Sequence, residues 1–166
     1  MGCQLEKLNG QEKTRACIDY GCEELGRLKS VLVHTPGDEL KLVNELNYKK
    51  WLYDKVPDIS GYVEEHRNYR ELLESNGIKV YELEDHVEEN IDLMKKMPNI
   101  TFLHDTAVVS KKGAMLSKMR PPAREKEEVV VREALSNLGI PILNEFNGEK
   151  GFFEGGLLIN NLLKVQ

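Results

Sequence analysis

The stretch Leu72–Leu83, "LLESNGIKVYEL", decides the expected fold, because it joins the end of a helix to the start of a strand. Apolar residues at helical spacing predict an amphipathic helix over residues 60–75, and Gly77 provides the backbone freedom with which helices commonly end. The residues after this glycine alternate as in a strand. Residues 134–146, "ALSNLGIPILNEF", repeat the order of helix, Gly-Ile and strand 62 positions further on. The pair predicts a repeated strand–helix–strand module, and therefore an α/β fold.

Further elements are expected around these two junctions. Residues 28–36 are apolar and β-branched and predict a core strand. Residues 100–110 and 114–119 predict a β-hairpin whose turn contains Lys111-Lys112-Gly113, and residues 123–139 predict a helix with acids near its start. "FEGGLLIN", residues 153–160, would open a third module.

The composition narrows the class of protein. With 166 residues, 40% of them apolar and 31% charged, the chain resembles an ordinary soluble globular protein. We expect a polar lead-in over residues 1–25 and one domain over residues 26–166. A net charge of −5 with scattered basic residues argues against a nucleic-acid partner. Short apolar runs and the absence of a secretory signal predict a cytoplasmic protein without a membrane partner.

The three cysteines, Cys3, Cys17 and Cys22, all lie near the start of the sequence. An odd number of cysteines in a cytosolic chain argues against a disulfide framework. Cys17 and Cys22 could hold a metal, but no second pair or nearby histidine completes such a site. Free thiols are therefore expected.

Three residues stand out as candidates for chemistry, and each has a structural alternative. Asp105 closes an apolar segment read as a strand, where an aspartate could instead accept local backbone hydrogen bonds. Arg124 stands near a helix start, where its charge opposes the helix dipole, so that it either binds a carboxylate or pairs with the glutamates after it. Glu154 precedes Gly155-Gly156 and is either a ligand for a cation or part of an exposed turn.

Together the three residues suit a ligand with a cationic and an anionic end. Asp105 and Glu154 could grip a planar guanidinium by paired, charge-assisted hydrogen bonds, while Arg124 holds a carboxylate. Arginine or a close relative has that shape.

Five stretches in the same order carry a resemblance to a known superfamily. The sequence resembles the N-terminal part of arginine deiminases and related guanidino-group-modifying enzymes, the amidinotransferase-like or pentein superfamily, over nearly all of residues 24–160. The stretches are "ELGRLKSVLVHTPGDEL" (24–40), "WLYDKVPDI" (51–59), "LLESNGIKVYELED" (72–85), "PNITFLHDTAVVSKKGAMLSKMRPPAREKE" (98–127) and "FEGG" (153–156).

The resemblance implies an α/β propeller of five ββαβ modules, of which this sequence would hold about two and a half. It also implies a hydrolase of the guanidino group that uses neither a metal nor an organic cofactor. A cysteine thiolate attacks the guanidinium carbon to give a thiouronium intermediate, and a histidine protonates the leaving ammonia and then assists water. Arginine and water would give citrulline and ammonia.

The resemblance also implies roles for individual residues. Asp105 matches a guanidinium-binding aspartate, and Glu154 matches a glutamate that works with the histidine. Arg124 matches the arginine that binds the substrate α-carboxylate. Asn99 and Phe102 match positions that line the substrate pocket.

The sequence departs from the family pattern in ways that leave alternatives open. Leu157 stands where the family's E-G-G-D motif has aspartate, and the helical insertion typical of arginine deiminases is missing between Asp85 and Pro98. The missing insertion favours a resemblance to the smaller dimethylarginine dimethylaminohydrolases or to other amidinotransferase-like members. The catalytic cysteine and histidine are expected in a C-terminal half, so that this chain alone is expected to be inactive. Two other hypotheses stay open. The chain could be an arginine-binding module without catalysis, or a fragment that forms homo-oligomers or pairs with a complementing half.

Overall fold

The computed structural model describes residues 7–8, 11–12, 20–21 and 27–145, and statements about structure below refer to these residues. The α-helices are α1 (Ile59–Ser75), α2 (Ile91–Met94) and α3 (Glu127–Asn137). The strands are β1 (Lys7–Leu8), β2 (Gln11–Glu12), β3 (Ser30–Val33), β4 (Lys79–Glu82), β5 (Ala107–Ser110), β6 (Gly113–Leu116) and β7 (Ile142–Glu145). Four short 3-10 helices complete the set: η1 (Asp38–Leu42), η2 (Leu83–His86), η3 (Leu103–Asp105) and η4 (Pro122–Arg124).

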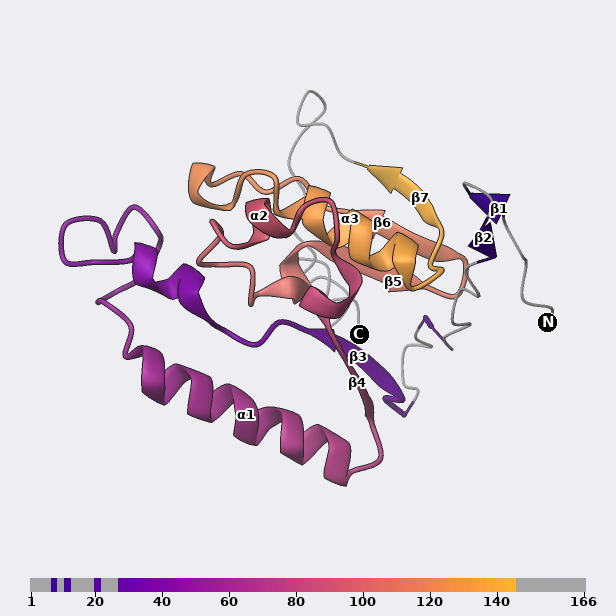
Figure 1. Cartoon of the computed structure of the whole chain (residues 1–166), viewed down its shortest axis with the longest axis horizontal. Helices are drawn as coiled ribbons and strands as arrows, with labels where there is room; N and C mark the ends of the chain where they lie inside the picture. Colours follow the sequence, from indigo (N-terminus) through magenta and orange to yellow (C-terminus); the bar gives the residue numbers. More distant parts are fainter. Residues whose placement is uncertain (1–6, 9–10, 13–19, 22–26, 146–166) are drawn as a thin grey trace, which may run out of the picture.

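The described part of the chain contains two strand–helix–strand units, which confirms the predicted repeat. Strands β3 and β4 are parallel and joined through α1, and strands β6 and β7 are parallel and joined through α3. Parallel neighbours need such a crossover, because a short turn can join only antiparallel strands. Gly77 and Gly139 follow the two helices with φ of +73° and +79°, a conformation that favours glycine. Figure 1 shows α1 along one edge of the molecule, with β3 and β4 between it and the sheet that carries α3.

Strands β5 and β6 form the predicted antiparallel hairpin, with Ser110 opposite Gly113. Gly113 is required here by a close approach, because a Cβ at this position would lie 2.4 Å from the carbonyl oxygen of Pro141. The hairpin also carries β7 as its third strand, on the side of β6.

Two predicted elements are shorter than the sequence suggested. The segment before β5 is not a strand: it forms turns and the 3-10 helix η3, so the placement of Asp105 on a strand was wrong. The predicted helix over residues 123–139 begins only at Glu127, because Lys126 adopts a left-handed conformation (φ 72°) that separates η4 from α3.

The main apolar core lies around α3. Helix α3 packs against strand β6, the 3-10 helix η2 and helix α2. This packing holds the segment before β5 against the start of α3, which is where the candidate site forms. The fully buried apolar side chains of this core include Leu83, Ile100, Leu116 and Val130.

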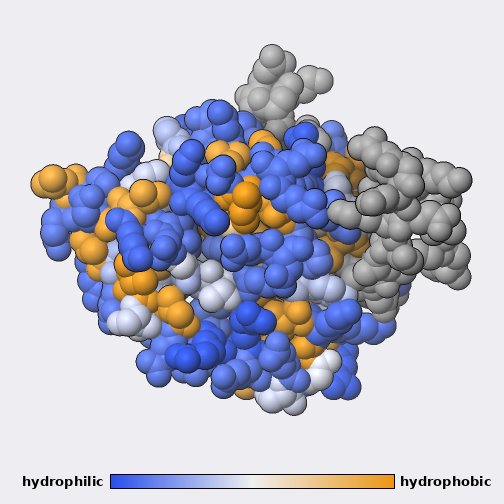
Figure 2. Space-filling model, in the orientation of Figure 1, coloured by the Kyte–Doolittle hydropathy of each residue, from blue (hydrophilic) through white to orange (hydrophobic). Residues whose placement is uncertain are grey.

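The surface seen in the orientation of Figure 1 is mostly hydrophilic, with apolar side chains in separate small groups (Figure 2). Leu46 and Leu52, in the loop before α1, are among the most exposed large apolar residues. In the part of the chain that the structure describes, no helix has the length and apolar character needed to cross a lipid bilayer.

Glu133 of α3 ties the segment before α2 to the core. Its carboxylate accepts hydrogen bonds from the backbone N–H groups of Glu88, Glu89 and Asn90, at 2.6, 2.7 and 3.0 Å, and from the Asn90 side chain at 2.8 Å. Burial opposes ionisation of Glu133, but these hydrogen bonds outweigh it and lower the pKa of the carboxyl group.

Replacing Glu133 by glutamine is expected to lower the free energy of unfolding by about 1.5–3 kcal/mol at neutral pH, because the donors lose a charged acceptor. Since the folded-state pKa is depressed, the contribution is present above the ordinary glutamate pKa and is lost as the pH falls through the folded-state value. Urea unfolding at pH 7 and at acidic pH measures both effects. The exposed Glu125→Gln variant is the control, and an equal loss in the two variants would contradict this role of Glu133.

Candidate active site

The candidate site is built on the turn that precedes β5. Asn99 is buried, and its side-chain amide donates to the carbonyl oxygen of Trp51 at 3.0 Å. The hydroxyl of Tyr53 donates to the carbonyl oxygen of Pro98 at 2.8 Å. These two contacts fix the turn against the loop before α1, although the partners are far apart in the sequence.

Arg124 is the centre of the site. Its side chain is only 8% exposed, and its Nη1 lies 2.6 Å from Oδ2 of Asp105. Its Nε donates to the carboxylate of Glu127 at 2.9 and 3.1 Å, and its Nη2 donates to the carbonyl oxygen of Phe102 at 3.0 Å. Nη2 also lies 2.8 Å from Oε2 of Glu127. The guanidinium therefore lies between two carboxylates, in the geometry of strong charge-assisted hydrogen bonds.

Glu127 is the residue of this cluster that the sequence did not single out. It is the first residue of α3 and is fully buried, with 0% exposure. Burial raises the pKa of Glu127 to about 7, although the hydrogen bonds and charge of Arg124 act in the opposite direction. A carboxyl group with such a pKa changes its charge near neutral pH.

Asp105 is the more accessible carboxylate of the pair. Its side chain is 19% exposed, and its Oδ1 lies 3.1 Å from Nε2 of His104, whose side chain is 64% exposed. Asp105 and His104 both lie on the 3-10 helix η3, so the two neighbouring side chains contact each other instead of pointing to opposite faces, as neighbours on a strand would. Oδ2 of Asp105 thus contacts Arg124, and Oδ1 contacts the exposed imidazole of His104.

The structure brings together three of the residues that the sequence singled out. Arg124 contacts both Asp105 and Phe102, and its guanidinium carbon lies 5.9 Å from the centre of the Phe102 ring. Asn99 belongs to the same turn, but its amide is bonded to the loop at Trp51. The alternative of an ion pair between Arg124 and a following glutamate is confirmed, in a buried form, by the Glu127 contact.

Glu154, the second expected carboxylate, lies outside the described residues, as do Leu157 and the glycines that follow Glu154. Cys3, Cys17 and Cys22 also lie outside them.

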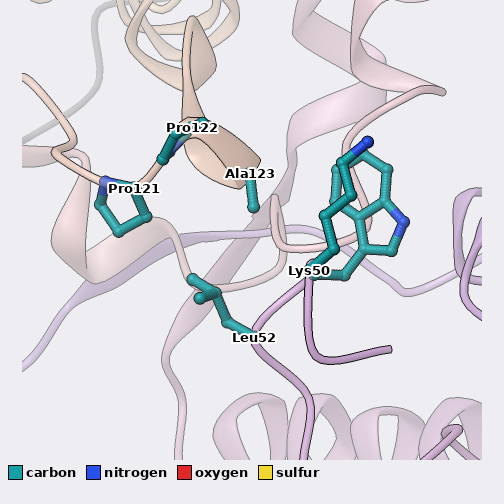
Figure 3. A pocket seen from close by; sticks show the side chains of 6 residues that line it. Lys50, Leu52, Pro121, Pro122 and Ala123 are labelled. Carbon is teal, nitrogen blue, oxygen red and sulfur yellow. The ribbon is translucent and has the colours of Figure 1, made fainter. Parts of the chain in front are cut away.

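A cavity of about 400 Å³ lies between the loop before α1 and the segment that precedes Arg124. Figure 3 shows its walls: Lys50 and Leu52 come from the loop before α1, and they face Pro121, Pro122 and Ala123 across the opening. Two of its lining residues are neighbours of site residues: the carbonyl oxygen of Trp51 accepts the hydrogen bond from Asn99, and Ala123 directly precedes Arg124 in the sequence. Leu52 has a φ of 65°, which is rare for a non-glycine residue and marks a strained backbone.

A second buried polar cluster surrounds His34, immediately after β3. Nε2 of His34 lies 3.3 Å from Oε1 of Glu39, and Nδ1 lies 3.7 Å from Oε1 of Glu82. Glu82 also binds Arg70 at 3.1 Å. Thr101 donates to the carbonyl oxygen of His34 at 3.3 Å and so joins this cluster to the turn of the candidate site.

His34 and Glu39 are buried, whereas the side chains of Glu82 and Arg70 are partly exposed. Burial opposes the ionisation of Glu39, but hydrogen bonds from His34 and from the Gly37 N–H outweigh it and lower the pKa of Glu39. Within the described ranges, no group of three or more histidine, cysteine or acidic side chains could hold a metal ion.

The fold has relatives among solved structures. Dimethylarginine dimethylaminohydrolase, solved as an adduct with S-methyl-L-thiocitrulline, superposes with a TM-score of 0.57 at 17% identity over 78% of this chain and 46% of that one. The enzyme from Pseudomonas aeruginosa, solved as a mutant with citrulline, gives a TM-score of 0.55 at 17% identity over 78% of this chain and 45% of that one. The shared fold is that of the pentein enzymes.

The sequence has curated relatives as well, and they bear the name arginine deiminase. The protein from Borrelia recurrentis is 38% identical over 68 residues, which are 41% of this chain and 17% of the relative. The protein from Rhodococcus opacus is 40% identical over 68 residues, with the same coverage of 41% and 17%. No protein-family model matches the chain. Together, the fold and these relatives support the pentein superfamily for the matched part of the chain, which spans about a sixth of the length of the curated relatives.

Proposed function

We propose that the chain forms the guanidinium-binding part of a hydrolase of the arginine deiminase type, in which arginine and water give citrulline and ammonia. The observation that supports this proposal most is the pairing of the partly exposed Asp105 carboxylate with a guanidinium group, that of Arg124, at 2.6 Å. A carboxylate held ready for a planar cation is what such a reaction requires of the protein.

In this proposal Asp105 and Glu154 bind the substrate guanidinium, and Arg124 binds the substrate α-carboxylate. Because Arg124 contacts Asp105, both roles require the whole guanidinium group of Arg124 to turn from Asp105 toward the ligand, since its nitrogens share one rigid plane. The ion pair between Asp105 and Arg124 is then replaced by two ion pairs with the ligand, one between Asp105 and its guanidinium and one between Arg124 and its α-carboxylate. Asn99 keeps the loop at Trp51 in place, and the ring of Phe102, 39% exposed, forms a wall of the pocket.

The reaction itself would follow the superfamily's covalent route. A cysteine thiolate adds to the guanidinium carbon, a histidine protonates the leaving nitrogen, and ammonia departs to leave a thiouronium. Water adds to the same carbon, and collapse releases citrulline and restores the thiolate. The thiolate and the histidine are assigned to the second half of a pentein domain, whether it lies in the same polypeptide or in another.

Dimethylarginine is the second candidate substrate, since the solved structures with this fold are dimethylarginine dimethylaminohydrolases. The two candidates share the guanidinium and the α-carboxylate and differ in the methyl groups on one nitrogen. An amidinotransferase would use the same first half of the reaction, with an amine in place of water. A binding module without catalysis would form the same ion pairs with the ligand but would not carry out the covalent steps.

We expect calorimetry to show binding of arginine to this chain, and no binding of lysine, which has a carboxylate but no guanidinium. Combined with a pentein half that carries the cysteine and histidine, the chain should produce citrulline, and comparison of arginine with dimethylarginine then selects between the two substrates. Binding without turnover in a complete domain would favour the binding module. A complete domain that neither binds nor converts any guanidino compound would sink the proposal.

A further inference from the structure

A buried carboxylate lies behind the proposed guanidinium site without being able to reach a ligand. Glu127 is fully enclosed, and both of its oxygens are taken by Arg124, at 3.1 and 2.9 Å from Nε. Arg124 in turn reaches Asp105, the partly exposed carboxylate, at 2.6 Å. The three side chains form a line from the core to the surface.

We propose that Glu127 is a positioning residue for Asp105: acting through Arg124, it sets how much of the Asp105 charge is left for a bound guanidinium. This inference rests on the proposed function. With Glu127 ionised, two carboxylates share one guanidinium, and the group of three has a net negative charge that attracts a cation. With Glu127 protonated, Arg124 is neutralised by Asp105 alone, and the attraction is lost.

The other charged groups near Glu127 do not supply this control. Glu128, the next residue of α3, is buried but bonded to Lys118 at 2.6 Å, so this pair adds little net charge. Tyr53, from the loop before α1, also acts on this cluster, and burial raises its pKa above its usual range, so that it stays neutral. His104 also contacts Asp105, with its Nε2 3.1 Å from Oδ1 of the carboxylate. The test must therefore separate His104 from Glu127.

The direction of the effect follows from the pKa of Glu127. Burial raises it to about 7, so the carboxyl group is protonated at pH 6 and ionised at pH 8. Arginine keeps its guanidinium charge throughout this range, because that group titrates above pH 12. Affinity for arginine should therefore rise with pH, by about five- to tenfold between pH 6 and pH 8.

The experiment is calorimetric titration of the chain with arginine at pH 6, 7 and 8, repeated for three single variants. Glu127→Gln should bind arginine more weakly at pH 8 and lose the pH dependence. Glu128→Gln, the adjacent buried glutamate, and His104→Gln should both keep it. A Glu127→Gln variant with the original affinity and pH profile would overturn the proposal, as would loss of the pH dependence in His104→Gln alone.

A measurement without ligand separates this inference from the proposed function. The carboxyl carbon resonance of Asp105, followed by NMR from pH 5 to pH 9 in the His104→Gln variant, should show an inflection that follows the titration of Glu127 and is absent when Glu127→Gln is added. An Asp105 resonance that does not respond to Glu127 overturns the inference even if arginine binds. If that response is present but arginine does not bind at any pH, the proposed function fails while the coupling between the two carboxyl groups stands.

Discussion

Replacement of Arg124 by methionine is expected to lower the free energy of unfolding by about 3–5 kcal/mol. Methionine keeps much of the apolar stem but removes the guanidinium that Glu127 and Asp105 share. The cost arises mainly at Glu127, which is fully buried and would lose the cation that neutralises it. Protonation of Glu127 relieves part of the cost, so the destabilisation should be smaller at pH 5 than at pH 8. Urea unfolding at the two pH values measures both quantities.

Two variants make this prediction specific. Arg120→Met removes an exposed arginine four residues earlier and should change stability by no more than about 0.5 kcal/mol. The double variant Arg124→Met with Glu127→Gln should recover part of the loss, because no charge is then left buried without a partner. Equal stability of Arg124→Met and Arg120→Met would show that the ion pairs of Arg124 contribute nothing to the fold.

The repeated unit could be predicted because its signals are local. The apolar period of α1 and the glycines that follow the two helices are visible in short stretches of sequence. Gly77 and Gly139 both adopt a positive φ, which glycine tolerates better than other residues. The segment before β5 was misread, because Phe102 and Leu103 extend the apolar run of the strand. Its true shape depends on the contact between Asn99 and Trp51, which joins residues 48 positions apart.

The sequence singled out Asp105 and Arg124 but not the contact between them. Asp105 and Arg124 were expected to hold opposite ends of one ligand, and the structure shows them bonded to each other. Their 19-residue separation gives no local sign of that pairing. Glu127 was missed because acids in the first turn of a helix are already explained by the helix dipole. The spacing of three residues between Arg124 and Glu127 was the available signal, since side chains at that spacing often pair.

The Asp105→Asn variant should bind arginine about 10- to 100-fold more weakly than the original chain, because a charge-assisted hydrogen bond to the ligand becomes a neutral one. The volume of the side chain is nearly unchanged, and the amide oxygen of the introduced asparagine could still accept a hydrogen bond from Arg124. Stability should therefore fall by only about 1 kcal/mol. Calorimetry with arginine at pH 8 and low ionic strength, beside thermal unfolding, measures the two effects separately.

The neighbouring variant His104→Gln is the matched control, because His104 is exposed and contacts the same carboxylate. It should bind arginine at pH 8 within about twofold of the original chain, since the Asp105 carboxylate and its contact with Arg124 are left in place. If Asp105→Asn keeps the affinity for arginine, Asp105 only pairs with Arg124, and the guanidinium site must lie elsewhere. If it loses both affinity and several kcal/mol of stability, the pairing with Arg124 is its main role. Only a large loss of affinity with the fold intact assigns the exposed oxygen of Asp105 to a ligand.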